Sequence, residues 1–142
     1  MTRQTKYLIC ILLIQILGSC ANDGPFVDNF CGNKIIKEIA SPDKDYSAIM
    51  FVRDCGATTG YSTQVSIVEY GDKLENTIGN ILVMSDKPSG AIFENGGAMV
   101  EIAWNANNEL NISYDKACEV FKNKSHLDGI KINYTPLDTL TR

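Results

Sequence analysis

The sequence predicts a mainly β protein of the α+β class, with an antiparallel meander sheet of about six strands and one short helix packed on it. Residues 46–53 (YSAIMFVR) are apolar on both faces, as in a central strand that is covered on two sides. Further segments with strand character are separated by Gly, Pro, Asn and Asp. The gaps between them are too short for parallel crossovers, which favours antiparallel neighbours. These segments are residues 62–70, 81–84, 99–104, 109–114 and 129–135.

The segments 99–104 and 109–114 predict a hairpin whose register follows from burial. Alternate positions on one face of each segment are apolar, and directly opposed residues of a hairpin point to the same face. A slip by one residue would set Asn111 against Ile102, so burial rejects that register. Residues 105–109 are then the expected loop. The expected pairs are Trp104 with Leu110, Ile102 with Ile112 and Val100 with Tyr114.

The short helix is expected over residues 116–122, directly after Asp115. A carboxylate at that position can accept hydrogen bonds from the free backbone amides of a first helical turn. Ala117, Val120 and Phe121 fall on one side at helical spacing and would pack on the sheet. Residues 129–135 would return behind this helix as a half-exposed strand.

The amino terminus has the layout of a secretory signal. Arg3 and Lys6 precede an apolar run over residues 7–17, which is shorter than the roughly 20 residues of a transmembrane helix. The run ends in LGSC at residues 17–20, which resembles the lipobox of bacterial lipoproteins. This resemblance implies cleavage before Cys20 and a diacylglycerol on its thiol. Because Ala21 and not Asp follows, it also implies the outer membrane facing the periplasm, with the inner membrane or the cell surface as alternatives.

The chain is therefore expected to divide into a signal peptide (1–19), a lipidated tether (20–30) and one antiparallel β-rich domain (31–142). Without the signal it has 11 basic and 17 acidic residues, a net charge of −6. Such a chain has no cluster of Lys and Arg residues that would bind nucleic acid, and no polybasic patch that would bind anionic lipid. We expect the lipid on Cys20 to be its membrane contact, and another envelope protein to be its partner.

Five cysteines reduce to three in the exported domain, namely Cys31, Cys55 and Cys118. Export favours disulfides, and three cysteines permit three different single bridges. Cys31 and Cys55 bracket the strand at 46–53, so we expect these two to pair, with Cα atoms about 4.4–6.8 Å apart. Cys118 is then expected to be a buried thiol.

Cys55 lies within the stretch RDCGATTGYSTQ at residues 53–64, which we interpret as a hairpin connection. With Cys55 held in a bridge, the polar surface of this connection is a candidate for recognition. Its candidate recognition residues are Asp54, Thr58, Thr59 and Tyr61.

A thiol enzyme or small envelope hydrolase is the alternative interpretation of Cys55. Cysteine nucleophiles need a neighbouring imidazole, and the chain has one histidine, His126, with Asp128 two residues on. A bridged Cys55 would exclude this chemistry. The spacing of cysteine and histidine does not match a metal site, and no cofactor motif is present, so we expect neither a metal nor a cofactor.

The segments SPDKDYSA (41–48), RDCGATTG (53–60) and STQVSI (62–67) resemble a string shared by a group of small bacterial proteins, many of them exported. The resemblance implies no activity and no catalytic residues. The small size, the strand-rich character and the expected disulfide favour a lipid-anchored module without catalysis. We expect such a module to bind or block another envelope molecule, as an inhibitor, an immunity-type factor or an assembly partner.

Overall fold

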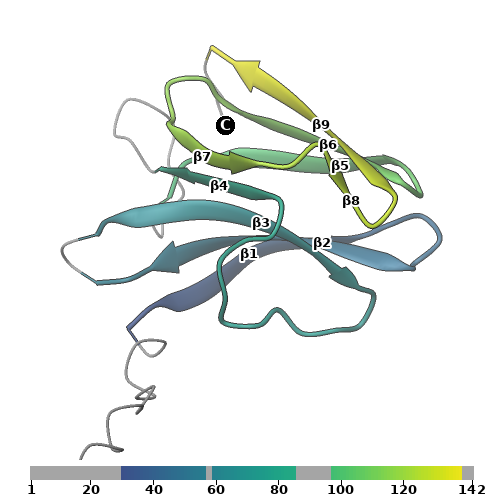
Figure 1. Ribbon diagram of the computed structural model, residues 1–142, viewed down its shortest axis with the longest axis horizontal. Coiled ribbons are helices and arrows are strands. Elements are labelled where there is room, and N and C mark those ends of the chain that lie inside the picture. The colour runs from purple at the N-terminus through teal and green to yellow at the C-terminus, as the bar shows by residue number, and fades with distance from the viewer. Residues whose placement is uncertain (1–29, 57–58, 86–96, 139–142) are drawn as a thin grey trace, which may run out of the picture.

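The computed structural model describes residues 30–56, 59–85 and 97–138, and these form nine strands in two sheets (Figure 1). The larger sheet has the strand order β1-β2-β3-β4-β7, and the smaller one has the order β5-β6-β9-β8. The strands are β1 (Gly32–Ala40), β2 (Tyr46–Asp54), β3 (Tyr61–Glu69), β4 (Leu82–Ser85), β5 (Val100–Ala106), β6 (Glu109–Asp115), β7 (Val120–Asn123), β8 (His126–Leu127) and β9 (Ile130–Leu137).

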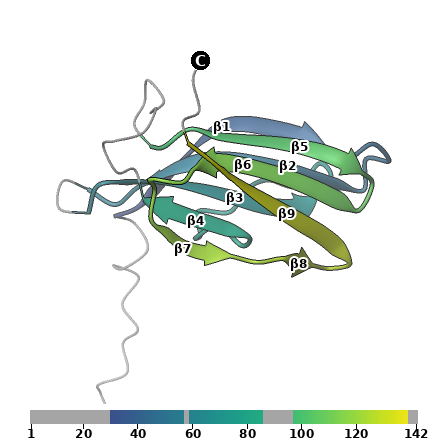
Figure 2. The same cartoon turned by 90° about the horizontal axis from the view of Figure 1, so that it is seen from above.

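The two sheets lie face to face as two layers, which Figures 1 and 2 show from two directions. The core between them combines alternate side chains of both sheets, because successive residues of a strand point to opposite faces. Met50, Val65 and Leu82 contribute from the larger sheet, and Ile102 and Ile112 from the smaller one. The mainly β class that the sequence predicts is confirmed.

Strand β2 is buried on both of its faces, as its continuous apolar sequence predicts. Ala48 and Met50 belong to the core between the sheets, whereas Ile49 and Phe51 point to the opposite side, which we call the outer face of the larger sheet. Ile49 is only 1% exposed and Phe51 is 0% exposed. The outer face is therefore covered by another part of the chain.

The predicted register of the β5–β6 hairpin is confirmed. As expected, Trp104 pairs with Leu110, Ile102 with Ile112 and Val100 with Tyr114. The loop is shorter than expected, because Ala106 pairs with Glu109 and the irregularity between Trp104 and Ala106 sets Asn105 outside the ladder. Trp104 and Tyr114 are partly buried and pack against the core.

The expected helix at 116–122 is wrong, since the described residues contain no helix. Asp115 still accepts a hydrogen bond from a backbone amide, that of Ala117 at 2.8 Å, but this bond closes a turn between β6 and β7. Val120 and Phe121 then begin an edge strand, and Phe121 is 62% exposed instead of packed on the sheet. The same cap chemistry serves a turn and a helix, so the local sequence did not distinguish them.

The single antiparallel meander is also wrong in part. The strands divide between two sheets, and β6 pairs with β9 in parallel. The chain makes the required crossover through β7 and β8, which are strands, where the sequence suggested a helix. Strands β1, β7 and β8 were not predicted.

Both open sides of the sandwich are tied by one polar aromatic group each. On the β1–β5 side, the indole Nε1 of Trp104 donates to the carbonyl of Ile39 at 3.1 Å. On the other side, the hydroxyl of Tyr134 donates to the carbonyls of Ile81 and Lys124, both at 3.0 Å. Burial raises the pKa of Tyr134, with nearby Tyr114 adding to the effect.

Nothing in the described segments is a helix of the length and apolar character needed to cross a membrane.

Candidate recognition site

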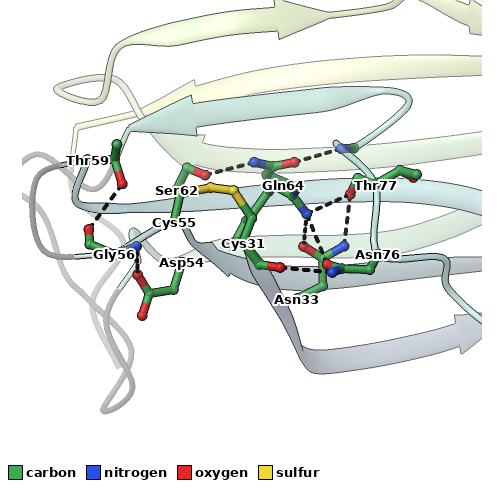
Figure 3. The surroundings of a disulfide bond; sticks show 12 residues. Cys31, Asn33, Asp54, Cys55, Gly56, Thr59, Ser62, Gln64, Asn76 and Thr77 are labelled. Carbon is green, nitrogen blue, oxygen red and sulfur yellow. Dashed lines mark hydrogen bonds between the residues drawn. A yellow bond between two sulfur atoms is a disulfide. The ribbon is translucent and has the colours of Figure 1, made fainter. Parts of the chain in front are cut away.

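Cys31 and Cys55 form a disulfide, as predicted, at the end of the β1–β2 ladder (Figure 3). The first pair of that ladder joins Gly32 to Asp54, so the two cysteines face each other directly beyond it. Their Cα atoms are 3.9 Å apart, which is below the range of about 4.4–6.8 Å that we expected. The bridge ties the residue before β1 to the residue after β2.

The bridge removes the thiol of Cys55, so in this state Cys55 is not a nucleophile. His126 lies on β8 of the other sheet, is exposed, and its Nδ1 is 3.2 Å from the Ser125 hydroxyl. Asp128 follows at a turn with a positive φ of 49°. Cys118 takes no part in the bridge and is buried, as predicted.

The β2–β3 connection places three of the four candidate recognition residues at its surface. Asp54 accepts a hydrogen bond from the amide of Gly56 at 2.8 Å, and the Thr59 hydroxyl donates to the carbonyl of Gly56 at 3.1 Å. Tyr61 opens β3 opposite Asp54. A surface hollow of about 330 Å³ is lined by Asp54, Gly56, Gly60 and Tyr61. Thr58, like Cys20, lies outside the described residues.

The outer face of the larger sheet is covered by the β3–β4 loop (residues 70–81), which runs below the larger sheet in Figure 1. The amide oxygen of Gln64, a buried residue on β3, accepts from the amide of Gly79 at 2.6 Å. A Cβ at Gly79 would lie 2.7 Å from the carbonyl oxygen of Leu82 and 3.0 Å from the Cβ of Gln64. Glycine is therefore what allows this close approach.

Asn80 fixes the same loop at its far end. Its side-chain oxygen accepts from the amide of Ile67 at 2.9 Å, and its side-chain nitrogen donates to the carbonyl of Ile67 at 2.7 Å. The amide of Asn80 donates to the hydroxyl of Ser66 at 3.1 Å. The Asn80 side chain thus takes the place of a neighbouring strand where the β3–β4 ladder stops, at Val65.

Arg53 holds the middle of the loop beside the disulfide. Its Nη1 donates to the side-chain oxygens of Asn33 at 2.7 Å and Asn76 at 3.2 Å, and to the carbonyl of Thr77 at 3.3 Å. Asn76 in turn donates to the carbonyl of Cys31 at 2.8 Å. Figure 3 shows Asn33, Asn76 and Thr77 gathered next to the bridge. These contacts connect the disulfide, β1 and the loop in one polar network.

The segment SPDKDY makes the turn between β1 and β2. The buried Ser41 donates to the carboxylate of Asp43 at 2.6 Å and accepts from the amide of Tyr46 at 3.1 Å. The Ser41 hydroxyl holds the pKa of the Asp43 carboxyl below its usual value. The carbonyl of Asp45 accepts from the amide of Tyr70, the first residue of the loop, at 2.9 Å. Each of the three segments 41–48, 53–60 and 62–67 thus has a residue that contacts the loop, namely Asp45, Arg53 and Gln64.

Two hollows flank residues 72–74 of this loop. One, of about 410 Å³, lies toward β1, and the other, of about 290 Å³, lies toward the end of β3. We call the two hollows together the outer groove. Its lining residues are Ile35, Glu38, Ile49, Ser66, Val68, Glu69, Gly71, Asp72, Lys73, Leu74, Glu75, Thr77, Ile78 and Asn80.

The outer groove could not be predicted from the sequence. The loop sequence GDKLENTIGN at 71–80 is rich in turn residues, and nothing in it indicates the face on which the loop lies. A usable signal was present in β2, whose outward apolar residues required a cover.

No protein-family model, no curated protein and no solved structure matches the chain.

Proposed function

We propose that this chain is a lipid-anchored protein of the bacterial cell envelope that binds another envelope protein without catalysis, as an inhibitory, immunity-type or assembly factor. The LGSC segment supports the anchor at Cys20. The Cys31–Cys55 bridge supports export, because disulfides persist in oxidising compartments. A tether of about ten residues between Cys20 and the sandwich would place the domain within roughly 35 Å of the membrane.

The observation that carries the binding proposal is the way the β3–β4 loop is held. Arg53 and Gln64 bind the backbone of the loop, and Asn80 of the loop binds the backbone of Ile67 on β3, so the shape of the loop does not depend on a partner. Tyr70 and Ile78 meanwhile remain 51% and 55% exposed. A loop that a rigid sheet positions, with apolar side chains left at the surface, is typical of recognition sites.

A thiol enzyme that uses Cys55 and His126 remains the alternative, and it requires a reduced Cys55. Alkylation of the purified, unreduced protein after denaturation tests this directly. We expect Cys118 to be labelled, and Cys55 to be labelled only after reduction. Labelling of Cys55 without reduction would restore the alternative.

The anchor and the partner are tested in the native envelope. The variant Cys20→Ala should abolish incorporation of labelled palmitate, and normal labelling of this variant would overturn the anchor. A photo-reactive amino acid at Ile78 should cross-link one defined envelope protein. The matched control places it at Phe121, which is also exposed but lies on β7 at the edge of the sheet opposite to β1. Equal cross-linking at both positions would contradict a specific site.

A further inference from the structure

The outer groove combines an apolar floor with apolar rims. Ile49, at 1% exposure, forms part of the floor, and Leu74 of the loop lines both hollows. Ile35 on β1 is 50% exposed at one hollow, and Ile78 is 55% exposed at the other. Exposed apolar side chains next to a hollow are typical anchors for a partner's side chains.

Acidic side chains outnumber basic ones among the residues that line this groove. Four carboxylates line it, from Glu38, Glu69, Asp72 and Glu75, against the single cation of Lys73. The two ion pairs found among the described residues, Lys116–Asp138 and Lys131–Glu109, lie elsewhere. Two further cations contact the loop and are held by hydrogen bonds: Nη1 of Arg53 donates to the carbonyl of Thr77 at 3.3 Å, and Nζ of Lys122 donates to the carbonyl of Gly79 at 2.8 Å.

We propose that the outer groove binds a basic, extended segment of the partner protein, in which lysine or arginine residues alternate with aliphatic ones. The aliphatic side chains would pack against Ile35, Leu74 and Ile78. The cations would meet the carboxylates on the rim, which favours this occupant over an acidic one through charge complementarity. This inference rests on the proposed binding function and adds the chemistry of the partner.

The test uses the full-length protein in micelles of a neutral detergent and two defined peptides. One peptide alternates lysine and valine, and the other has glutamate in place of lysine. Backbone amide shifts measured by NMR should change at Ile35, Leu74 and Ile78 with the lysine peptide and stay unchanged with the glutamate peptide. Binding should weaken as salt is added, because exposed charge pairs are screened.

The decisive comparison neutralises the same number of acids at two places. The groove variant Glu38→Gln/Asp72→Asn/Glu75→Gln should weaken binding of the lysine peptide by about tenfold. The control variant Glu101→Gln/Glu119→Gln/Asp128→Asn has the same net charge, and we expect wild-type affinity from it. Equal weakening in both variants would overturn the groove as the site and leave only the attraction of an acidic protein for a cation.

Two other results would also overturn the inference. If spermine, which carries charge without aliphatic branches, produced the same amide shifts with the same affinity, the groove would be a site for cations alone. If the shifts arose on concentrating the protein without peptide, the occupant would be a second copy of this chain. A negative peptide experiment together with a specific cross-link from another face would reject the groove and leave the proposed binding function standing.

Discussion

The two sheets of the sandwich bury their side chains differently. In the smaller sheet, β5 alternates between buried and exposed positions, with Val100 and Ile102 in the core and Glu101 at the surface. In the larger sheet, β2 has six consecutive buried residues, because the β3–β4 loop covers its outer face. Alternation indicates register only where one face of a strand meets water, so the β5–β6 hairpin of the smaller sheet could be set in register from sequence and β2 of the larger sheet could not.

The cover of the larger sheet is also different in kind from its core. The core is apolar, whereas the loop is fixed to the outer face by polar contacts of Arg53, Gln64 and Asn80. Apolar burial is tolerant of sequence detail, but hydrogen bonds require particular partners at particular positions. The polar residues that fix the loop therefore lie on the side of the larger sheet that carries the outer groove.

The largest expected effect tests whether the outer face is a second core. Ile49→Ala should lower the free energy of unfolding by roughly 2–5 kcal/mol, because it removes buried methyl groups and leaves a cavity under the loop. Glu101→Ala, at the exposed face of the smaller sheet, should change it by no more than about 0.5 kcal/mol. Urea denaturation of both variants measures the difference. A cost below about 1 kcal/mol for Ile49→Ala would mean that the loop does not close over this face in solution.

Removing the disulfide should show a second difference between the two sheets, because it should weaken the larger sheet more than the smaller one. Cys31→Ser/Cys55→Ser should lower the free energy of unfolding by about 3–4 kcal/mol, since the bridge closes a loop with a sequence separation of 24. Hydrogen exchange should accelerate first in β1 and in the loop network around Asn76, and the β5–β6 hairpin should keep its protection. Uniform acceleration in both sheets would contradict this division. A reductant should destabilise the wild-type protein and leave the variant unchanged.

Substitution of one glycine should test the close approach of loop and sheet. Gly79→Ala should cost about 1–3 kcal/mol in the free energy of unfolding, because its Cβ would meet backbone and side-chain atoms of β3 and β4. Gly32→Ala on β1 is the matched control, since a Cβ there would have no atom within 4 Å. Thermal denaturation compares the two. Equal stability of both variants would place the loop farther from β3 than described.

The smallest expected effect concerns the smaller sheet and depends on pH. Hydrogen bonds from Asn105 and Asn133, followed by Lys131, lower the pKa of Glu109 from 4.5 to about 2. A lowered pKa contributes stability above the unfolded value of 4.5, and this stability is lost as the pH falls toward 2. Glu109→Gln should therefore reduce the urea midpoint more at pH 6 than at pH 2. The same difference at both values would show that the charge of Glu109 is not what stabilises this cluster.

Several features could be predicted because their physical causes are local. The strand segments follow from runs of apolar residues, and the β5–β6 register follows from alternation across one short hairpin. The Cys31–Cys55 pairing follows from the position of the two cysteines on either side of one strand. Strand β1 was missed because its isoleucines do not alternate: Ile35 and Ile36 are adjacent at the bulge in its ladder with β2.

By itself, the sequence determined that the domain is built of strands, how one hairpin is aligned, and which cysteines pair. The tertiary structure alone decided that β6 and β9 run in parallel, that Asp115 closes a turn, and that a loop covers the outer face of the larger sheet. The physical reason is the range of the interactions. The side chain of Asn33 donates a hydrogen bond to the carbonyl of Thr77 in that loop, although the two residues are 44 positions apart. Local propensities depend on neighbouring residues only, so they do not predict which distant group will accept such a bond.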